Sequence, residues 1–146
     1  MKATVATRLS IAATREEVFK YLTDLRYHYL WNPQVRKIST TEKVKLGSHF
    51  TTESQILGVK IRAKNVVTEL DPPVKFSLEN KLGTVRYLAK FRLKSDGNKT
   101  LVRLATTVEA DNSIGFFTVP VLKQLALREL KTDLHALKVA VENQLH

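Results

Sequence analysis

Asp24-Leu25-Arg26-Tyr27-His28-Tyr29-Leu30-Trp31-Asn32-Pro33 separates two parts of the chain that differ in hydrophobic period. Pro33 ends any helix that runs through this stretch, because the residue before a proline is kept out of the helical region. The period predicts a short helix before the stretch, and a series of strands and one long amphipathic helix after it. This order is typical of a curved sheet wrapped around a helix, an arrangement that often encloses a pocket.

The residues before this stretch predict one strand and one capped helix. Apolar and polar residues alternate from Ala3 to Ile11, which favours a strand. Thr14 and Glu17 have the spacing of a capping box, in which Thr14 accepts from the amide of Glu17 and the Glu17 carboxylate reaches back. The helix that they open carries Val18 and Leu22 at helical spacing.

After Pro33 the hydrophobic period is two, and six further strands are predicted. The Asp71-Pro72-Pro73 run ends one of them, and Asp96-Gly97 is expected to form the centre of a type I′ hairpin turn. Short turns between consecutive strands predict an antiparallel meander. The predicted strands are Val35–Thr40, Ser48–Ile56, Gly58–Leu70, Val74–Leu82, Thr84–Lys94 and Lys99–Ala110.

From Thr118 onward the period becomes helical, with Thr118 as the expected N-cap and Pro120 in the first turn. At about 1.5 Å per residue this helix is roughly 35–40 Å long. One long helix on one antiparallel sheet is an α+β arrangement that buries both apolar faces. Its apolar stripe consists of Val119, Leu122, Ala126, Leu130, Leu134, Leu137, Val141 and Leu145, and its polar face of Arg128, Lys131, His135, Lys138 and Glu142.

Length and composition predict a single domain over residues 1–146. The absence of cysteine excludes disulfides and thiolate chemistry. The first residues contain no apolar run of the kind found in secretory signals, so we expect a cytoplasmic location. The formal net charge of +10 favours an anionic partner, although charge of this size also serves solubility.

Several residues together resemble the pattern of one protein superfamily. They are Val18, Phe19, Leu22, Asp24, Trp31, Pro33 and Val35, followed by Arg128-x-Leu130-x-x-x-Leu134-x-x-Leu137-Lys138. With the order of elements, they make the chain similar to the helix-grip fold of the START and birch-pollen-allergen superfamily (SRPBCC). Within it, the chain most resembles small polyketide cyclase/dehydrase and lipid-transport proteins. The resemblance implies about seven strands curved around the C-terminal helix, short helices after the first strand, and an elongated cavity between sheet and helix.

Strand parity predicts which side chains face that cavity, because the more apolar side of each strand should face inward. Apolar walls with a few polar groups describe a ligand pocket, but they also describe a filled core. The predicted ligand-binding residues are Trp31, Phe50, Ile61, Asn65, Phe76, Leu78, Asn80, Tyr87, Phe91, Leu104, Thr106, Leu130, Leu134 and Leu137.

Some of these inward residues are polar and need hydrogen-bond partners, because an unpaired buried amide or hydroxyl costs about 1–3 kcal/mol. Neighbouring backbone, ordered water or a ligand can supply the partners. Asn65, Asn80 and Tyr87 are the best candidates for orienting a ligand carbonyl or hydroxyl.

No motif identifies a catalytic centre, and no cofactor or metal is expected. The chain shows no HExxH motif, no Ser-His-Asp order and no phosphate-binding glycine loop. His28 is the one histidine near the expected pocket mouth, but we interpret it as a packed or surface histidine in preference to a functional one. The catalytic residues therefore stay unknown.

The outward-facing strand residues predict a basic convex sheet face. Such a face fits peripheral contact with an anionic membrane or another acidic surface, or is simply solvated. Sequence-specific nucleic-acid binding is not expected, because the aromatic residues Tyr87 and Phe91 point inward instead of offering base-stacking surfaces. The basic residues are Lys60, Arg62, Lys64, Lys75, Lys81, Arg86, Lys90 and Arg92.

Three functions follow from these observations and the resemblance. The first is binding or transport of a small hydrophobic or amphipathic ligand. The second is an enzyme of cyclase or dehydratase type, with Tyr87, Asn65, Asn80 and His28 as conceivable proton-transfer or carbonyl-orienting groups. The third is a basic interaction module without a ligand. An acid–base residue with a perturbed pKa in the cavity would favour the enzyme, a uniformly apolar cavity the carrier, and a filled interior the third function.

Overall fold

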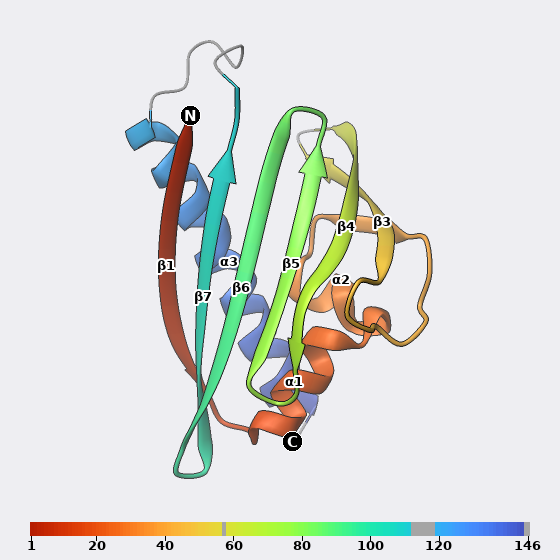
Figure 1. Ribbon diagram of the computed structural model, residues 1–146. Coiled ribbons are helices and arrows are strands. Elements are labelled where there is room, and N and C mark those ends of the chain that lie inside the picture. The colour runs from red at the N-terminus through yellow and green to blue at the C-terminus, as the bar shows by residue number, and fades with distance from the viewer. Residues whose placement is uncertain (57, 112–118, 145–146) are drawn as a thin grey trace.

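The computed structural model describes residues 1–56, 58–111 and 119–144. It contains one seven-stranded sheet in the order β1-β7-β6-β5-β4-β3-β2, in which all neighbours are antiparallel (Figure 1). The α+β helix-grip fold expected from the sequence is confirmed. The strands are β1 (Lys2–Ile11), β2 (Val35–Ile38), β3 (His49–Ile56), β4 (Val59–Asp71), β5 (Lys75–Leu82), β6 (Val85–Asp96) and β7 (Lys99–Glu109). The helices are α1 (Arg15–Thr23), η1 (Leu25–Tyr27), α2 (His28–Trp31) and α3 (Val119–Gln144).

The helical segments begin and end where their capping residues require. Thr14 Oγ1 accepts from the amide of Glu17 at 3.2 Å, as the capping box predicts. Asp24 Oδ1 accepts from the amide of Arg26 at 3.1 Å and begins the 3₁₀ turn η1. The last helical residue of α2 is Trp31, two positions before Pro33. The expected N-cap of the long helix, Thr118, lies outside the described residues.

The strands begin and end within one or two residues of their predicted bounds, and two of the differences have a local cause. Asp96 pairs with Lys99, so the hairpin loop consists of Gly97 and Asn98 rather than Asp96 and Gly97. Gly97 has φ +63°, a region that glycine enters without steric cost, and asparagine is the other residue type that tolerates it. β2 ends at Ile38 and not at Thr40, because the Ser39 hydroxyl accepts from the amide of Thr51 at 2.8 Å and replaces a regular ladder bond.

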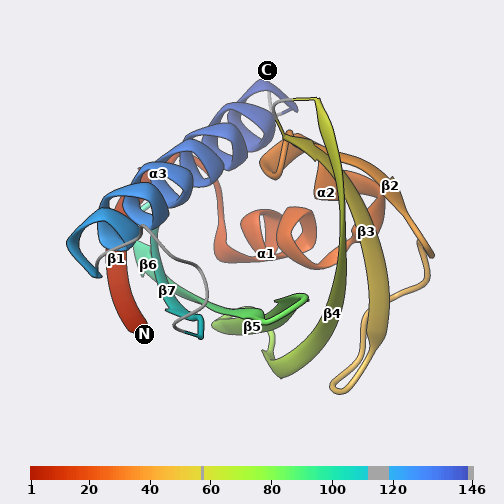
Figure 2. The same cartoon turned by 90° about the horizontal axis from the view of Figure 1, so that it is seen from above.

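The sheet curves around the helices, and α1 lies inside that curve between the sheet and α3 (Figure 2). The inward strand faces predicted from parity are buried as expected, with Phe76, Phe91, Leu104, Val67 and Val102 at 2% exposure or less. The buried stripe of α3 consists of Ala126, Leu130, Leu134, Leu137 and Val141. The core therefore fills the space around α1, and the first half of α3 covers a part of the sheet that α1 does not reach.

Candidate functional site

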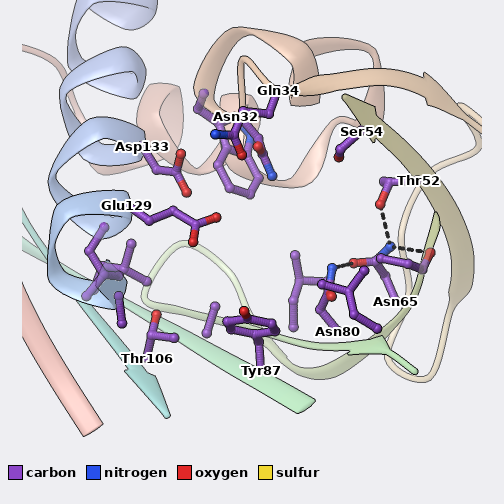
Figure 3. A pocket seen from close by; sticks show the side chains of 18 of the residues that line it. Asn32, Gln34, Thr52, Ser54, Asn65, Asn80, Tyr87, Thr106, Glu129 and Asp133 are labelled. Carbon is purple, nitrogen blue, oxygen red and sulfur yellow. Dashed lines mark hydrogen bonds between the residues drawn. The ribbon is translucent and has the colours of Figure 1, made fainter. Parts of the chain in front are cut away.

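A partly open pocket of about 170 Å³ lies between the first half of α3 and the concave side of the sheet. We call it the α3 pocket. Figure 3 shows its polar side chains pointing toward one another from α3, from the strands, and from the segment after α2. Its lining consists of Trp31, Asn32, Gln34, Thr52, Ser54, Ile61, Ala63, Asn65, Leu78, Asn80, Leu82, Tyr87, Ala89, Phe91, Leu104, Thr106, Ala126, Glu129, Leu130 and Asp133.

Most of the residues predicted to bind a ligand do line this pocket. They are Trp31, Ile61, Asn65, Leu78, Asn80, Tyr87, Phe91, Leu104, Thr106 and Leu130. Binding itself stays a prediction.

The structure places Phe50, Phe76, Leu134 and Leu137 in the packed core and not in the pocket wall. Phe76 packs edge-on against Phe19 of α1, with ring centroids 6.3 Å apart. Strand and helix parity select inward residues, but they do not say where α1 fills the space that those residues face.

A chain of side-chain amides crosses β3, β4 and β5 at the pocket wall (Figure 3). The amide nitrogen of Asn65 donates to Thr52 Oγ1 at 3.2 Å and to the carbonyl of Phe50 at 3.3 Å. Asn80 Nδ2 donates to Asn65 Oδ1 at 2.8 Å. Both ends of the Asn65 amide are thus used within the protein, whereas Asn80 Oδ1 is buried and has no partner among the described residues. Of the two asparagines predicted to orient a ligand, only Asn80 therefore has an unpaired acceptor, Oδ1, among the described residues.

His28 does not line the α3 pocket, although the sequence placed it near the mouth. Its ring is 3% exposed and packs edge-on against Trp31 and Phe50, at centroid distances of 4.5 and 5.9 Å. Burial lowers the pKa of His28 to about 4. His28 is therefore a packed, neutral core residue at pH 7 and is not part of the pocket lining.

Glu129 and Asp133 are pocket residues that the sequence analysis missed. They lie four residues apart on α3, and both carboxyl groups point into the pocket (Figure 3). The predicted polar face of the helix contained neither residue. Each directly precedes a buried leucine, Leu130 or Leu134, so each lies at the border of the apolar stripe. An acidic pair at that border, on a helix whose outer face is mainly basic, is a signal that could have identified them.

The environment of the α3 pocket favours the protonated forms of its acids. Burial raises the pKa of the Glu129 carboxyl. Burial, and after it the charge of Glu129, raise the pKa of Asp133 well above its usual range. Burial and then the charge of Glu129 also raise the pKa of the Tyr87 phenol. Much of the Glu129 residue is exposed, so burial acts on its carboxyl end within the pocket, and the half-buried Asp133 shows the larger effect.

The α3 pocket combines an apolar wall with the two titratable carboxyl groups of Glu129 and Asp133. The rings of Trp31 and Phe91 meet edge to face at 5.5 Å and form part of the wall. A carboxyl group with a raised pKa can donate a hydrogen bond or a proton while it is protonated, and its ionised form can accept one. Within the described residues, no group of three or more His, Cys, Asp or Glu side chains is placed to hold a metal ion.

The fold and the site define a class: helix-grip domains with a pocket beneath the C-terminal helix. Residues 2–142 match the model of the family described as polyketide cyclase/dehydrase and lipid transport. The chain therefore belongs to the polyketide cyclase/dehydrase and lipid-transport family. The comparison with curated proteins gives no match.

Solved structures show the same fold at low sequence identity. A START superfamily protein from Mycobacterium smegmatis is 20% identical, with a TM-score of 0.82 and coverage of 98% of this chain and 99% of that one. The Zhui aromatase/cyclase from Streptomyces sp. R1128 is 17% identical, with a TM-score of 0.81 and coverage of 100% and 97%. The protein TTHA0849 from Thermus thermophilus is 18% identical, with a TM-score of 0.79 and coverage of 97% and 98%. At these identities the likeness establishes the fold alone.

No helix in the described ranges, α3 included, has both the length and the hydropathy that a membrane span requires.

Proposed function

We propose that this protein binds a small amphipathic molecule in the α3 pocket. The observation that carries the proposal is the lining itself, in which apolar side chains such as Leu104 and Phe91 stand opposite Glu129, Asp133 and Asn80. The pocket beneath α3 supports ligand binding over the filled interior that a purely structural domain would have. Membership of a family that includes lipid-transport proteins agrees with this proposal.

The size of the pocket limits its ligand. A cavity of roughly 150 Å³ is enough for benzene, whereas drug-sized ligands occupy about 300–1,000 Å³. The α3 pocket, at about 170 Å³, holds an apolar group of about one ring. A lipid- or polyketide-like ligand would extend through the open side or require the walls to move apart.

The test is a titration with 2-phenylethanol followed by amide NMR, together with native mass spectrometry of freshly purified protein to find a co-purifying molecule. We expect shifts that saturate at millimolar or lower concentration and that centre on pocket residues such as Ala89 and Ala126. Ala89→Leu adds three carbons inside the pocket and should abolish the binding. Ala105→Leu, on the outer side of the neighbouring strand β7, is the matched control and should not. A folded protein that shows no saturable shifts would contradict the proposal.

A second candidate function is a cyclase or dehydratase activity, and the acid pair is the observation that favours it. An ionised carboxylate could remove a proton next to a ligand carbonyl, and a protonated carboxyl could protonate the alkoxide formed when the enolate attacks a second carbonyl. Loss of water then gives a cyclic enone. Heptane-2,6-dione is a substrate of suitable size, and enone formation can be followed by its ultraviolet absorbance. We expect Asp133→Asn to abolish any activity, while activity that survives in both Asp133→Asn and Glu129→Gln would exclude this mechanism.

A third proposal concerns the basic sheet face, defined as Lys60, Arg62, Lys64, Lys75, Lys81, Arg86, Lys90 and Arg92. The strands that carry these residues are neighbours, so that Lys64 pairs with Lys81 and Lys81 with Arg86 in one row across β4, β5 and β6. Such a row supports reversible contact with an anionic membrane surface, from which an amphipathic ligand could be loaded.

A further inference from the structure

The charges inside the α3 pocket are opposite in sign to those of the whole protein. The chain has 24 lysines and arginines against 14 acidic residues. Among the described residues that line the pocket, however, the two ionisable carboxyl groups of Glu129 and Asp133 meet no lysine, arginine or histidine. No ion pair of either carboxyl group is found within the described ranges. Two partly desolvated carboxylates without a neighbouring cation lower the stability of the folded protein unless their charge is neutralised.

The remaining walls also leave polar groups without partners. Trp31 is 5% exposed and lines the pocket, and its indole Nε1 has no acceptor among the described residues. Asn80 Oδ1 is likewise without a donor. Buried polar atoms in native structures are nearly always hydrogen-bonded to protein or water, so unpartnered atoms of pocket residues are available to a bound molecule or an ordered water.

Aromatic rings surround the same space. Trp31, Tyr87 and Phe91 all contribute to the lining. The face of an aromatic ring attracts an organic cation, most strongly for tryptophan, and the attraction increases when the cation is removed from water. Carboxylates beside aromatic faces are therefore a combination suited to a positively charged ligand, and poorly suited to the carboxylate of a fatty acid.

We infer that the ligand of the α3 pocket is a small organic cation, an apolar group of about one ring that carries a protonated amine. The inference rests on the proposed function and specifies its ligand class. The ring would lie against Phe91 and Leu104, and the ammonium group would lie between the carboxylates of Glu129 and Asp133. Asn80 Oδ1 is an additional acceptor for an N–H, and Trp31 Nε1 can donate to an oxygen of the ligand or to a bridging water.

Binding of such a cation is coupled to ionisation of the acids. The titratable groups that face the site are Glu129 and Asp133 from α3 and Tyr87 from β6, and the other lining elements contribute neutral side chains. Before binding, burial favours protonated carboxyls. An ammonium group favours the ionised forms, so its binding releases a proton and strengthens as pH rises through the pKa values of the carboxyls.

The experiment compares three probes of similar size by calorimetry at pH 7.5: 2-phenylethylamine, which is cationic, 2-phenylethanol, which is neutral, and phenylacetate, which is anionic. We expect the amine to bind at least tenfold more tightly than the alcohol, and phenylacetate to bind most weakly. Repeating the amine titration in two buffers of different ionisation enthalpy should show proton release. Its affinity should also rise with pH, while that of the alcohol changes less.

Matched variants assign the effect to the pocket acids. Asp133→Asn and Glu129→Gln should each weaken amine binding about tenfold and weaken alcohol binding much less, so that the preference for the amine is lost, whereas Glu42→Gln, an equal charge change on an exposed loop residue, should alter neither. If the alcohol binds and the amine binds no better, or if amine affinity falls with rising pH, the inference is overturned and the proposed function stands. If none of the three probes binds to folded protein, the proposed function fails as well.

Discussion

Asn65 and Asn80 are neighbours in the same hydrogen-bonded chain but have different tasks. Asn65 is 3% exposed and holds β3, β4 and β5 together through its own amide, whereas Asn80 makes one of these bonds and keeps a free acceptor at the pocket. The sequence predicted that both would face the cavity, and they do. It could not say which amide is already satisfied, because that depends on the register that brings Thr52 and Asn80 to either side of Asn65.

Replacing each asparagine by leucine should separate the structural role of Asn65 from the ligand-binding role of Asn80. Asn65→Leu leaves the half-buried Asn80 without the acceptor of its Nδ2, so we expect it to lower the free energy of unfolding by about 1–3 kcal/mol. Asn80→Leu should cost less stability and should mainly change the affinity for ligands in the α3 pocket. Urea denaturation and the probe titrations measure the two effects. Equal losses of stability with no change in binding for Asn80→Leu would contradict the assignment.

His28 makes the stability of the fold depend on pH. Its pKa of about 4 lies below the value of 6.5 of an unburied histidine. Below pH 6.5 His28 therefore binds a proton in the unfolded chain but not in the folded protein. The stability that neutral His28 contributes is fully present above pH 6.5 and is lost as pH falls toward 4. The loss attributable to this residue is about 3 kcal/mol, at 1.36 kcal/mol for each pKa unit.

Urea unfolding of the wild type and of His28→Phe between pH 7.5 and pH 4 isolates this contribution, because the remaining titratable groups are the same in both proteins. Phenylalanine keeps a ring against Trp31 and Phe50 without a titrating group. We expect the difference in stability between the two proteins to shift by about 3 kcal/mol in favour of the variant as pH is lowered. Parallel pH profiles would show that His28 titrates as it does in the unfolded chain.

At the scale of elements, α3 has two halves with different neighbours. Its first half, with Leu130, covers the pocket, and its second half, with Leu137, packs into the core around α1. Lys138 Nζ donates to the carbonyl of Ser10 at 2.9 Å and to Glu142 Oε2 at 2.8 Å, which fixes this second half to the end of β1. The apolar stripe predicted the helix and its buried face. It could not predict where packing stops, because that boundary is set by α1, a separate element.

Alanine substitutions at Leu137 and Leu130 test where along α3 the packed core ends and the pocket begins. Leu137→Ala removes contacts on all sides and should cost about 2–5 kcal/mol, as in other packed cores. Leu130→Ala should cost less, because part of its surface already faces empty space and has fewer contacts to lose. Denaturation midpoints give both values, and the larger pocket of Leu130→Ala should accept a bulkier probe. Equal and large losses at both sites would mean that α3 is packed uniformly along its length.

At the scale of the whole molecule, charge is separated between the two sides of the sheet. The concave side faces Glu129 and Asp133, and the convex side carries the basic sheet face. Glutamates lie within this face: Arg86 pairs with Glu79 at 2.8 Å and Arg92 with Glu69 at 2.7 Å. The sequence predicted the basic sheet face, because side chains alternate along a strand and the outward residues are those between the inward ones. The ion pairs depend on strand register, which hydrophobic alternation alone does not determine to the residue.

Of the five residues of the basic sheet face that the described ion pairs leave over, β4 carries three, and Lys75 and Lys90 lie on β5 and β6. Lys60, Arg62 and Lys64 are exposed, and none of them forms an ion pair within the described residues. A basic residue close to an anionic membrane contributes about 1 kcal/mol, and the attraction fades over a Debye length of roughly 8 Å at physiological salt. Three such residues acting together are enough for weak, reversible docking without insertion into the bilayer.

Co-sedimentation with vesicles, neutral or rich in phosphatidylserine and at low or high salt, tests this docking. We expect binding only to the anionic vesicles and at low salt, and its loss in the triple variant Lys60/Arg62/Lys64→Gln. The variant Lys123/Arg128/Lys131→Gln removes the same charge from exposed residues of α3, so it controls for net charge. If both triple variants lose binding equally, the attraction comes from the charge of the whole molecule and not from β4. If wild-type binding ignores lipid charge, the basic sheet face is a solvated surface, because a docking site built from lysine and arginine must distinguish the two lipids.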